Sequence, residues 1–279
     1  MDVIDSLVGD LNAETDELIS VIGPLTRKQW DTLTPAPGWT IGDQVTHLLV
    51  TESRACLAAA DTSAFAHMRS ADLADPGRLD RAVTGRRATP PAEAITELLA
   101  QREKLVKQLR TLPPRARIPW YGPDMGVASM LTARLMETWA HGQDIRDALR
   151  LAPSASDRLR HICRIGVATR HFSYLVNKRD VPEAPIAITL SAPDGASWFY
   201  GDEKARDTVS GSALDFCLVV TRRRHFADTA LVASGDTALE WLAIAQAYAG
   251  APGEGRKPGQ FVNDNDHSAN WTSTSGAQG

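Results

Sequence analysis

Residues 134–149, RLMETWAHGQDIRDAL, place Glu137 and His141 four positions apart, and residues 35–52, PAPGWTIGDQVTHLLVTE, carry His47. Both stretches are expected to be helical, and positions i and i+4 lie on the same face of a helix. A carboxylate and an imidazole spaced in this way can bind one metal ion, and a His on a neighbouring helix completes three ligands. Three protein ligands leave coordination positions open, as in catalytic metal sites. The spacing is also compatible with a Glu/His pair that only supports its helix.

Apolar residues recur at spacings of three, four and seven through the first 180 residues, which predicts amphipathic helices. The expected helices cover residues 3–23, 40–61, 91–112, 126–150 and 154–177. The weaker periodicity of residues 62–88 predicts a short helix and loop. Helices joined by short or moderate connections are typical of a bundle, and a bundle core can build a metal site from facing helices.

The pattern changes near residues 181–182. Ile186, Ile188 and Leu190 alternate with small or polar residues before a Pro-Asp-Gly turn, which predicts a β-hairpin. Further strands are expected at residues 205–211 and 230–235, and helices at 211–222 and 237–250. We therefore expect a bundle domain over residues 1–178 and a small α+β domain over 184–250. Residues 251–279 are rich in Gly, Ser, Asn and Asp, which predicts a disordered tail.

The two quoted stretches resemble the DinB/YfiT-like metal-binding superfamily, and residues 134–149 resemble the last bundle helix of its actinobacterial branch, that of mycothiol-dependent maleylpyruvate isomerase. In that branch two His and one Glu hold zinc, and the matching residues here are His47, Glu137 and His141. Many DinB relatives use three His, so Glu137 favours the isomerase-like branch. The resemblance implies a mainly α protein. It would consist of a DinB-like up-and-down four-helix bundle followed by a small α+β domain of the sterol-carrier-like kind.

Two carboxylates lie close in sequence to the expected ligands. Asp43 precedes His47 by four residues, and Asp144 follows His141 by three, so each could accept a ring N–H and orient its imidazole. Asp43 is also placed to cap its own helix, which is the favoured interpretation, and Asp144 could simply face solvent. Gln44, three residues before His47, can approach the open side of the site, but we assign it no role.

A run of three arginines, Arg222, Arg223 and Arg224, ends the helix expected at residues 211–222. Cations at that position can stabilise the negative end of a helix. Guanidinium groups can also bind a carboxylate through two hydrogen bonds, here in a cleft between the domains. The resemblance implies such a role, because C-domain arginine is implicated in binding substrate or thiol in the isomerase relatives. Arg86 and Arg87 are weaker candidates of the same kind.

The composition excludes several classes of protein. A net charge of −4 over 279 residues argues against a nucleic-acid or membrane-surface partner, and we find no apolar run of membrane-spanning length and no signal start. Cys56, Cys163 and Cys217 are an odd number of widely spaced cysteines, so we expect buried thiols and a reducing cytoplasm. Phosphate-binding glycine motifs, a serine-hydrolase elbow and H-E-x-x-H are absent from the sequence. The oligomeric state is left open.

The expected function is metal-dependent activation of a nucleophile, because a divalent ion lowers the pKa of a bound thiol or water. The resemblance implies zinc as the metal and mycothiol as the thiol, which would isomerise, or add to, a small electrophilic substrate. A His and carboxylate set also suits iron, nickel or manganese. Two alternatives remain: a hydrolase that uses metal-activated water, and a protein that binds a metal or ligand without turnover.

Overall fold

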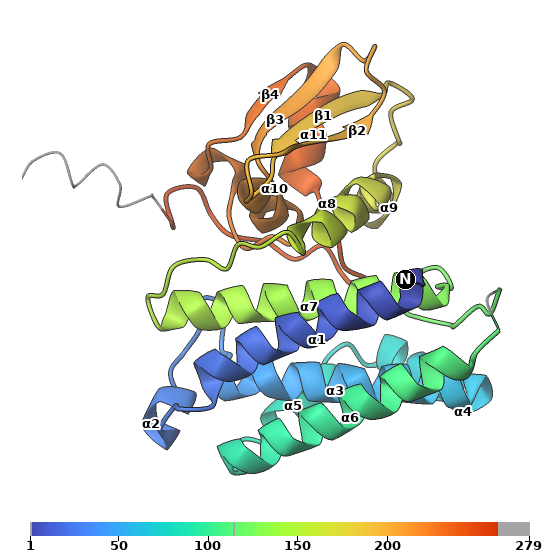
Figure 1. The fold of residues 1–279 in the computed structure, drawn as a ribbon, viewed down its shortest axis with the longest axis vertical. Helices are drawn as coiled ribbons and strands as arrows, with labels where there is room; N and C mark the ends of the chain where they lie inside the picture. The colour runs from blue at the N-terminus through green and yellow to red at the C-terminus, as the bar shows by residue number, and fades with distance from the viewer. Residues whose placement is uncertain (1, 114, 262–279) are drawn as a thin grey trace, which may run out of the picture.

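The computed structural model describes residues 2–113 and 115–261, which form a helical bundle and a smaller α+β unit stacked on one side of it (Figure 1). The long bundle helices are α1 (Val3–Ile22), α3 (Ile41–Ala60), α6 (Pro91–Thr111) and α7 (Val127–Ala148). The mainly α fold with a small α+β C-terminal unit, as expected from the sequence, is thus confirmed.

Local sequence signals account for where the bundle helices begin. The side chain of Asp2 caps α1, and Thr40 and Asp43 form a complete capping box at the start of α3. Pro91 occupies the first turn of α6, where its missing N–H costs nothing. The short helices α2 (Arg27–Trp30), α4 (Thr62–Ala74) and α5 (Arg78–Thr84) fill the connections.

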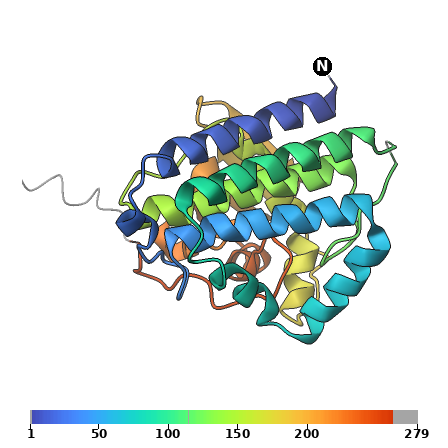
Figure 2. The same ribbon diagram turned by 90° about the horizontal axis from the view of Figure 1, so that it is seen from below.

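The bundle helices do not simply alternate in direction. Near the start of both α3 and α6, Arg87 pairs with Asp43, and further along both helices Arg102 pairs with Glu52, so α3 and α6 run in the same direction. The reason is that α4 and α5 carry the chain back before α6 begins (Figure 2). The helix α7 runs antiparallel to α3, so the first turns of α3 lie beside the second half of α7.

The α+β unit contains a mixed sheet with strand order β2-β1-β3-β4. Its strands are β1 (Ile186–Ser191), β2 (Ser197–Gly201), β3 (Asp207–Ser212) and β4 (Val232–Ser234). The expected hairpin is present, with β1 and β2 antiparallel, whereas β3 lies parallel to β1. The helices α10 (Ala213–Val220) and α11 (Asp236–Ile244) pack on the sheet, and a 3-10 turn, Phe226–Asp228, precedes β4.

The helices α8 (Leu159–Ala168) and α9 (Arg170–Val176) lie between the bundle and the sheet (Figure 1). The sequence prediction grouped them with the bundle, but α8 packs on α10 and β2 as well as on α7, and α9 packs on α11. Close approach explains the contact with α10: a Cβ on Gly166 would lie 2.8 Å from the side chain of Val220. One apolar core therefore continues from the bundle into the α+β unit.

Residues 251–261, here called the C-terminal segment, follow the surface of the protein. The sequence prediction placed a disordered tail from residue 251, yet this part makes defined contacts. The backbone N–H of Gly259 donates to Asp228 at 2.6 Å, and the ring of Phe261 lies 3.9 Å from the guanidinium carbon of Arg224. The rest of that prediction, residues 262–279, lies outside the described residues. Among the helices that are described, none is long and apolar enough to cross a membrane.

Candidate metal centre

The three expected ligands lie together where α3 faces α7. His47, Glu137 and His141 each offer one donor atom within 4.8 Å of the other two. Nε2 of His141 lies 3.2 Å from Oε2 of Glu137, and Nε2 of His47 lies 3.9 Å from the same oxygen. Bonds of about 2.0–2.1 Å in a tetrahedral zinc site separate the donors by roughly 3.3 Å. The donor set therefore fits a divalent ion with small side-chain adjustments.

Both protonation states that a metal requires are favoured by the surroundings. Burial lowers the pKa of His47 well below its ordinary value, and the neighbouring charge of His141 lowers it further. Burial alone would raise the pKa of Glu137, but the hydrogen bond with His141 and the charge of Arg134 bring it well below its usual range. At neutral pH the site thus offers a neutral imidazole and an ionised carboxylate, the forms that bind metals.

The ring of His141 is oriented by Gln44. Nδ1 of His141 donates to Oε1 of Gln44 at 2.5 Å, and the Gln44 amide nitrogen donates to the hydroxyl of Thr34 at 2.8 Å. This arrangement leaves Nε2 of His141 as the atom that faces Glu137. From sequence alone, Asp144 was a candidate for this role and Gln44 had none. The available signal was position, because Gln44 lies three residues before His47 and so shares its helix face.

Asp144 serves another purpose. It is 1% exposed, and its two oxygens take one guanidinium each, Arg223 at 3.0 Å and Arg256 from the C-terminal segment. It therefore holds the α+β unit and the C-terminal segment against α7, and the described residues show no hydrogen bond between it and His141. Asp144 thus neither orients His141 nor faces solvent, the two alternatives that its sequence position left open, because these distant arginines use both carboxylate oxygens.

Asp43 caps its helix, as favoured, and does not orient His47. Its carboxylate accepts from the backbone N–H and the hydroxyl of Thr40, at 2.8 and 2.9 Å, and pairs with Arg87 at 2.7 Å. Burial would raise the pKa of Asp43, but these hydrogen bonds lower it below the ordinary value. Nδ1 of His47 is buried and has no hydrogen-bond partner among the described residues. Arg86 also has a protein partner, Glu97 at 2.6 Å, so both arginines of this pair make ion pairs within the bundle.

The three arginines after Val220 do not act as one group. Arg224 makes a two-pronged ion pair with Asp147 of α7, at 2.8 and 2.7 Å. Arg223 donates to the carbonyl of Ala140 at 3.0 Å, in addition to its ion pair with Asp144. Two of the three candidates for binding a substrate carboxylate therefore already make ion pairs with α7, because the acidic residues of this helix face the α+β unit.

Arg222 differs from the other two arginines, because its side chain makes no ion pair with the described residues. Its backbone is left-handed, with φ of 61°, at the position following the C-cap of α10. Its side chain donates to the carbonyl of Gly253 at 3.3 Å and lines a cavity. This left-handed conformation is a common way to end a helix, and Arg150 and Lys178 adopt it at the same position after α7 and α9.

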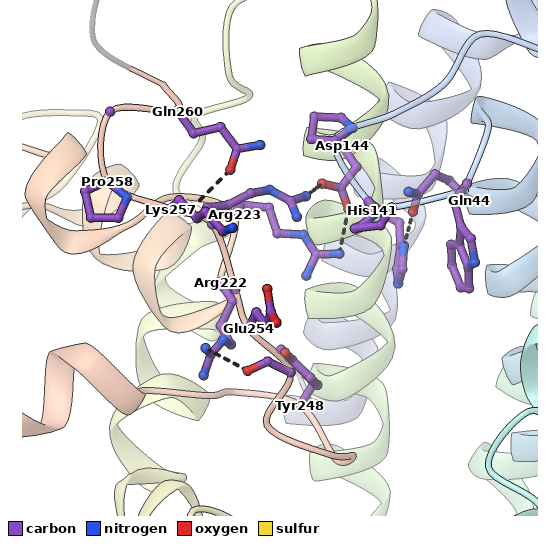
Figure 3. Close-up of a pocket in the computed structure, with 18 residues that line it drawn as sticks. Gln44, His141, Asp144, Arg222, Arg223, Tyr248, Glu254, Lys257, Pro258 and Gln260 are labelled. Atoms are coloured by element: carbon purple, nitrogen blue, oxygen red, sulfur yellow. Dashed lines mark hydrogen bonds and ion pairs between the residues drawn. The ribbon is translucent and has the colours of Figure 1, made fainter.

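A cavity of about 830 Å³ connects this arginine with the metal centre. Its bundle side includes Gln44 and His141, and its other side includes Arg222, Tyr248 and residues 253–260 (Figure 3). Trp39 forms part of the wall, with its ring centred 5.2 Å from that of His47 and its indole N–H donating to Asp80 at 2.9 Å. The cavity therefore gives a small molecule access to the His141 side of the centre.

Comparison with known proteins gives a matching family and two relatives that are similar in sequence. Residues 11–146 match the family model described as the mycothiol maleylpyruvate isomerase N-terminal domain. Uncharacterized proteins of Mycobacterium tuberculosis, from strains CDC 1551 / Oshkosh and ATCC 25618 / H37Rv, are each 44% identical over 250 residues, 89% of this chain and 97% of the relative.

Solved structures share the fold at low sequence identity. The crystal structure of the mycothiol-dependent maleylpyruvate isomerase matches with a TM-score of 0.56 and 13% identity, over 83% of this chain and 92% of that chain. A mutant of that enzyme matches over the same shares with a TM-score of 0.54 and 12% identity. The protein thus consists of a DinB-like helical bundle followed by an α+β unit. Residues 11–146 belong to the mycothiol maleylpyruvate isomerase N-terminal domain family, and the chain as a whole belongs to one family with the two mycobacterial proteins.

Proposed function

We propose that this chain is a divalent-metal-dependent enzyme, with zinc as the metal, that activates a low-molecular-weight thiol towards a small electrophilic substrate. The thiol is mycothiol, the co-substrate named for the family. The observation that carries the proposal is the convergence of His47, Glu137 and His141 from two helices beside a cavity of about 830 Å³. Three protein ligands with a cavity alongside are the arrangement of a catalytic rather than a structural metal site.

The protein residues around the centre support such chemistry. A divalent ion held by these ligands would lower the pKa of a bound thiol and provide a thiolate near neutral pH. Gln44 fixes the ring of His141, so that Nε2 remains directed towards Glu137. Trp39 supplies an apolar wall beside both His rings, which limits the access of water to the centre.

Substrate recognition is assigned to the far side of the cavity. Arg222 and Lys257 line it with positive charge, and Tyr248 adds a hydroxyl group. These groups suit an electrophile that carries a carboxylate, because a guanidinium can bind it through charge-assisted hydrogen bonds. The thiolate would add to the electrophile and either remain attached or leave again after isomerisation.

An assay with the thiol varied separates this reaction from its alternatives. The metal-loaded protein is incubated with a panel of unsaturated and carboxylated electrophiles, with mycothiol, without thiol, and with His47→Ala protein as the control. Product that requires both mycothiol and His47 supports the proposal. Product formed equally without thiol would instead identify a metal-dependent hydrolase, and saturable binding without product would identify a binding protein.

A further inference from the structure

The guanidinium of Arg134 lies in the bundle core, on the same face of α7 as two proposed ligands. Residues 134, 137 and 141 are three and seven positions apart, which places them in one row along a helix. The Arg134 side chain is 2% exposed. Its charge acts on the pKa of both Glu137 and His47, in addition to burial and to His141. A fixed positive charge therefore lies within electrostatic range of the metal centre.

Among the described residues, no ion pair or hydrogen bond at contact distance holds this guanidinium. Nε and Nη1 of Arg134 are buried without a hydrogen-bond partner in that part of the chain, and the ring of Trp120 lies 5.0 Å from the guanidinium carbon. Arg102 provides a contrast in the same bundle. It is 3% exposed, but it pairs with Glu52 at 2.6 Å and donates to the hydroxyls of Thr15 and Thr138 at 2.7 and 3.0 Å.

An unpaired buried cation works against both folding and metal binding. Removing a charge from water without a partner is unfavourable, so an apolar side chain of similar length would suit this position better for stability. The same charge repels a divalent ion held by His47 and Glu137. Both effects are offset when an anion joins the centre, because a preorganised cation then stabilises the negative charge without further rearrangement.

We propose that Arg134 is a positioning residue of the metal centre, a fixed cation that stabilises the thiolate form of the ligand at the open coordination position. This inference rests on the proposed function, because it requires a metal ion at His47, Glu137 and His141. Arg134 acts through the electrostatic potential of the site and need not contact the thiolate. It therefore favours loss of the thiol proton at a lower pH than the ion alone would allow.

Cobalt-loaded protein provides a test that does not depend on turnover. The thiolate-to-cobalt absorption band is followed as a function of pH with 2-mercaptoethanol as the probe. We expect Arg134→Met to weaken thiolate binding roughly tenfold at a fixed pH, which moves the midpoint up by about one pH unit. Cobalt affinity should stay equal or increase, and the melting temperature of the metal-free protein should stay equal or rise. Arg134→Lys keeps the charge and should retain most of the thiolate affinity.

Arg102→Met is the matched control, since it removes an equally buried arginine that has partners. It should lower the melting temperature, because Glu52 is left buried and unpaired, and leave the pH midpoint unchanged. An unchanged midpoint in Arg134→Met protein that still binds cobalt would overturn this inference and leave the proposed function intact. Failure of the wild-type protein to bind cobalt in a His47-dependent manner would overturn both.

Discussion

The side-chain oxygen of Gln44 lies 2.5 Å from Nδ1 of His141, so an amide on α3 holds the ring of a proposed ligand on α7. His47 follows Gln44 on the same helix by three residues, and α3 therefore supplies both one ligand and the group that orients another. The metal centre depends on the register between α3 and α7 as well as on the ligands themselves.

Gln44→Ala should weaken metal binding while the bundle stays folded. Loss of a hydrogen bond to a ligating His typically lowers metal affinity by about 10–100-fold. The measurement is competition with a chromophoric chelator, with circular dichroism to confirm the fold. Thr34→Val is the control, because it removes the partner of the Gln44 amide nitrogen but keeps the bond to His141. Equal affinities in wild-type and Gln44→Ala protein would show that the contact has no role in metal binding.

The lowered pKa of His47 makes the metal-free fold sensitive to acid. The unfolded chain binds a proton at His47 below about pH 6.5, whereas the folded chain does not until a much lower pH. Stability therefore rises with pH between the folded and unfolded pKa values, and is lost as the pH falls below about 6.5. Urea unfolding of the metal-free protein from pH 8 to 5 should show this decline.

His47→Gln should flatten that part of the stability profile, because glutamine does not titrate. Total stability at pH 8 can change in either direction, so the slope between pH 5 and 6.5 is the quantity to compare. Identical slopes for the wild-type and variant proteins would mean that His47 is not held neutral by its surroundings.

Arg222 and Arg224 should separate into a functional and a structural residue. Arg224→Gln leaves Asp147 buried without its partner and should lower the free energy of unfolding by about 3 kcal/mol. Arg222→Gln should leave stability nearly unchanged and raise KM about tenfold, since it would remove the proposed charge-assisted contact with the substrate carboxylate. Thermal unfolding and steady-state kinetics on the two variants test this. Similar kinetics in both would leave the cavity without an assigned carboxylate-binding group.

Arg256→Gln should loosen the C-terminal segment. Asp144 retains Arg223, so the bundle and the α+β unit stay joined, whereas residues 251–261 lose their ion pair with α7. Amide hydrogen exchange in this segment should become faster, with metal content unchanged. Lys257→Gln changes a neighbouring charge that lines the same cavity, and it should have little effect on exchange. Protection of the segment that survives Arg256→Gln would place its anchor elsewhere, at Asp228 or Arg224.

The sequence predicted those features that depend on local spacing. The apolar periodicity located α1, α3, α6 and α7 within one or two residues, and the i, i+4 spacing of Glu137 and His141 placed both on one face of α7. The capping box at Thr40 was also predictable, because its partners lie three residues apart. Each of these patterns lies within a single helix.

Features that depend on distant parts of the chain were not predictable in this way. Asp144 was a candidate to orient His141 because they are close in sequence, but its partners come from the end of α10 and from the C-terminal segment. The grouping of α8 with α10 depends on the close approach of Gly166 and Val220. The unpaired state of Arg134 is a property of the packed core, since a sequence shows neither burial nor missing partners.

The most direct test of the metal centre is elemental analysis of protein purified without a metal-affinity tag. Wild-type protein is compared with His47→Ala, Glu137→Ala and His141→Ala, and with Asp144→Asn as a control at a nearby buried carboxylate that binds arginines instead. We expect close to one divalent ion, zinc, per wild-type chain and per Asp144→Asn chain, and loss of most of it in the three ligand variants. Full metal occupancy in all three ligand variants would contradict the assignment.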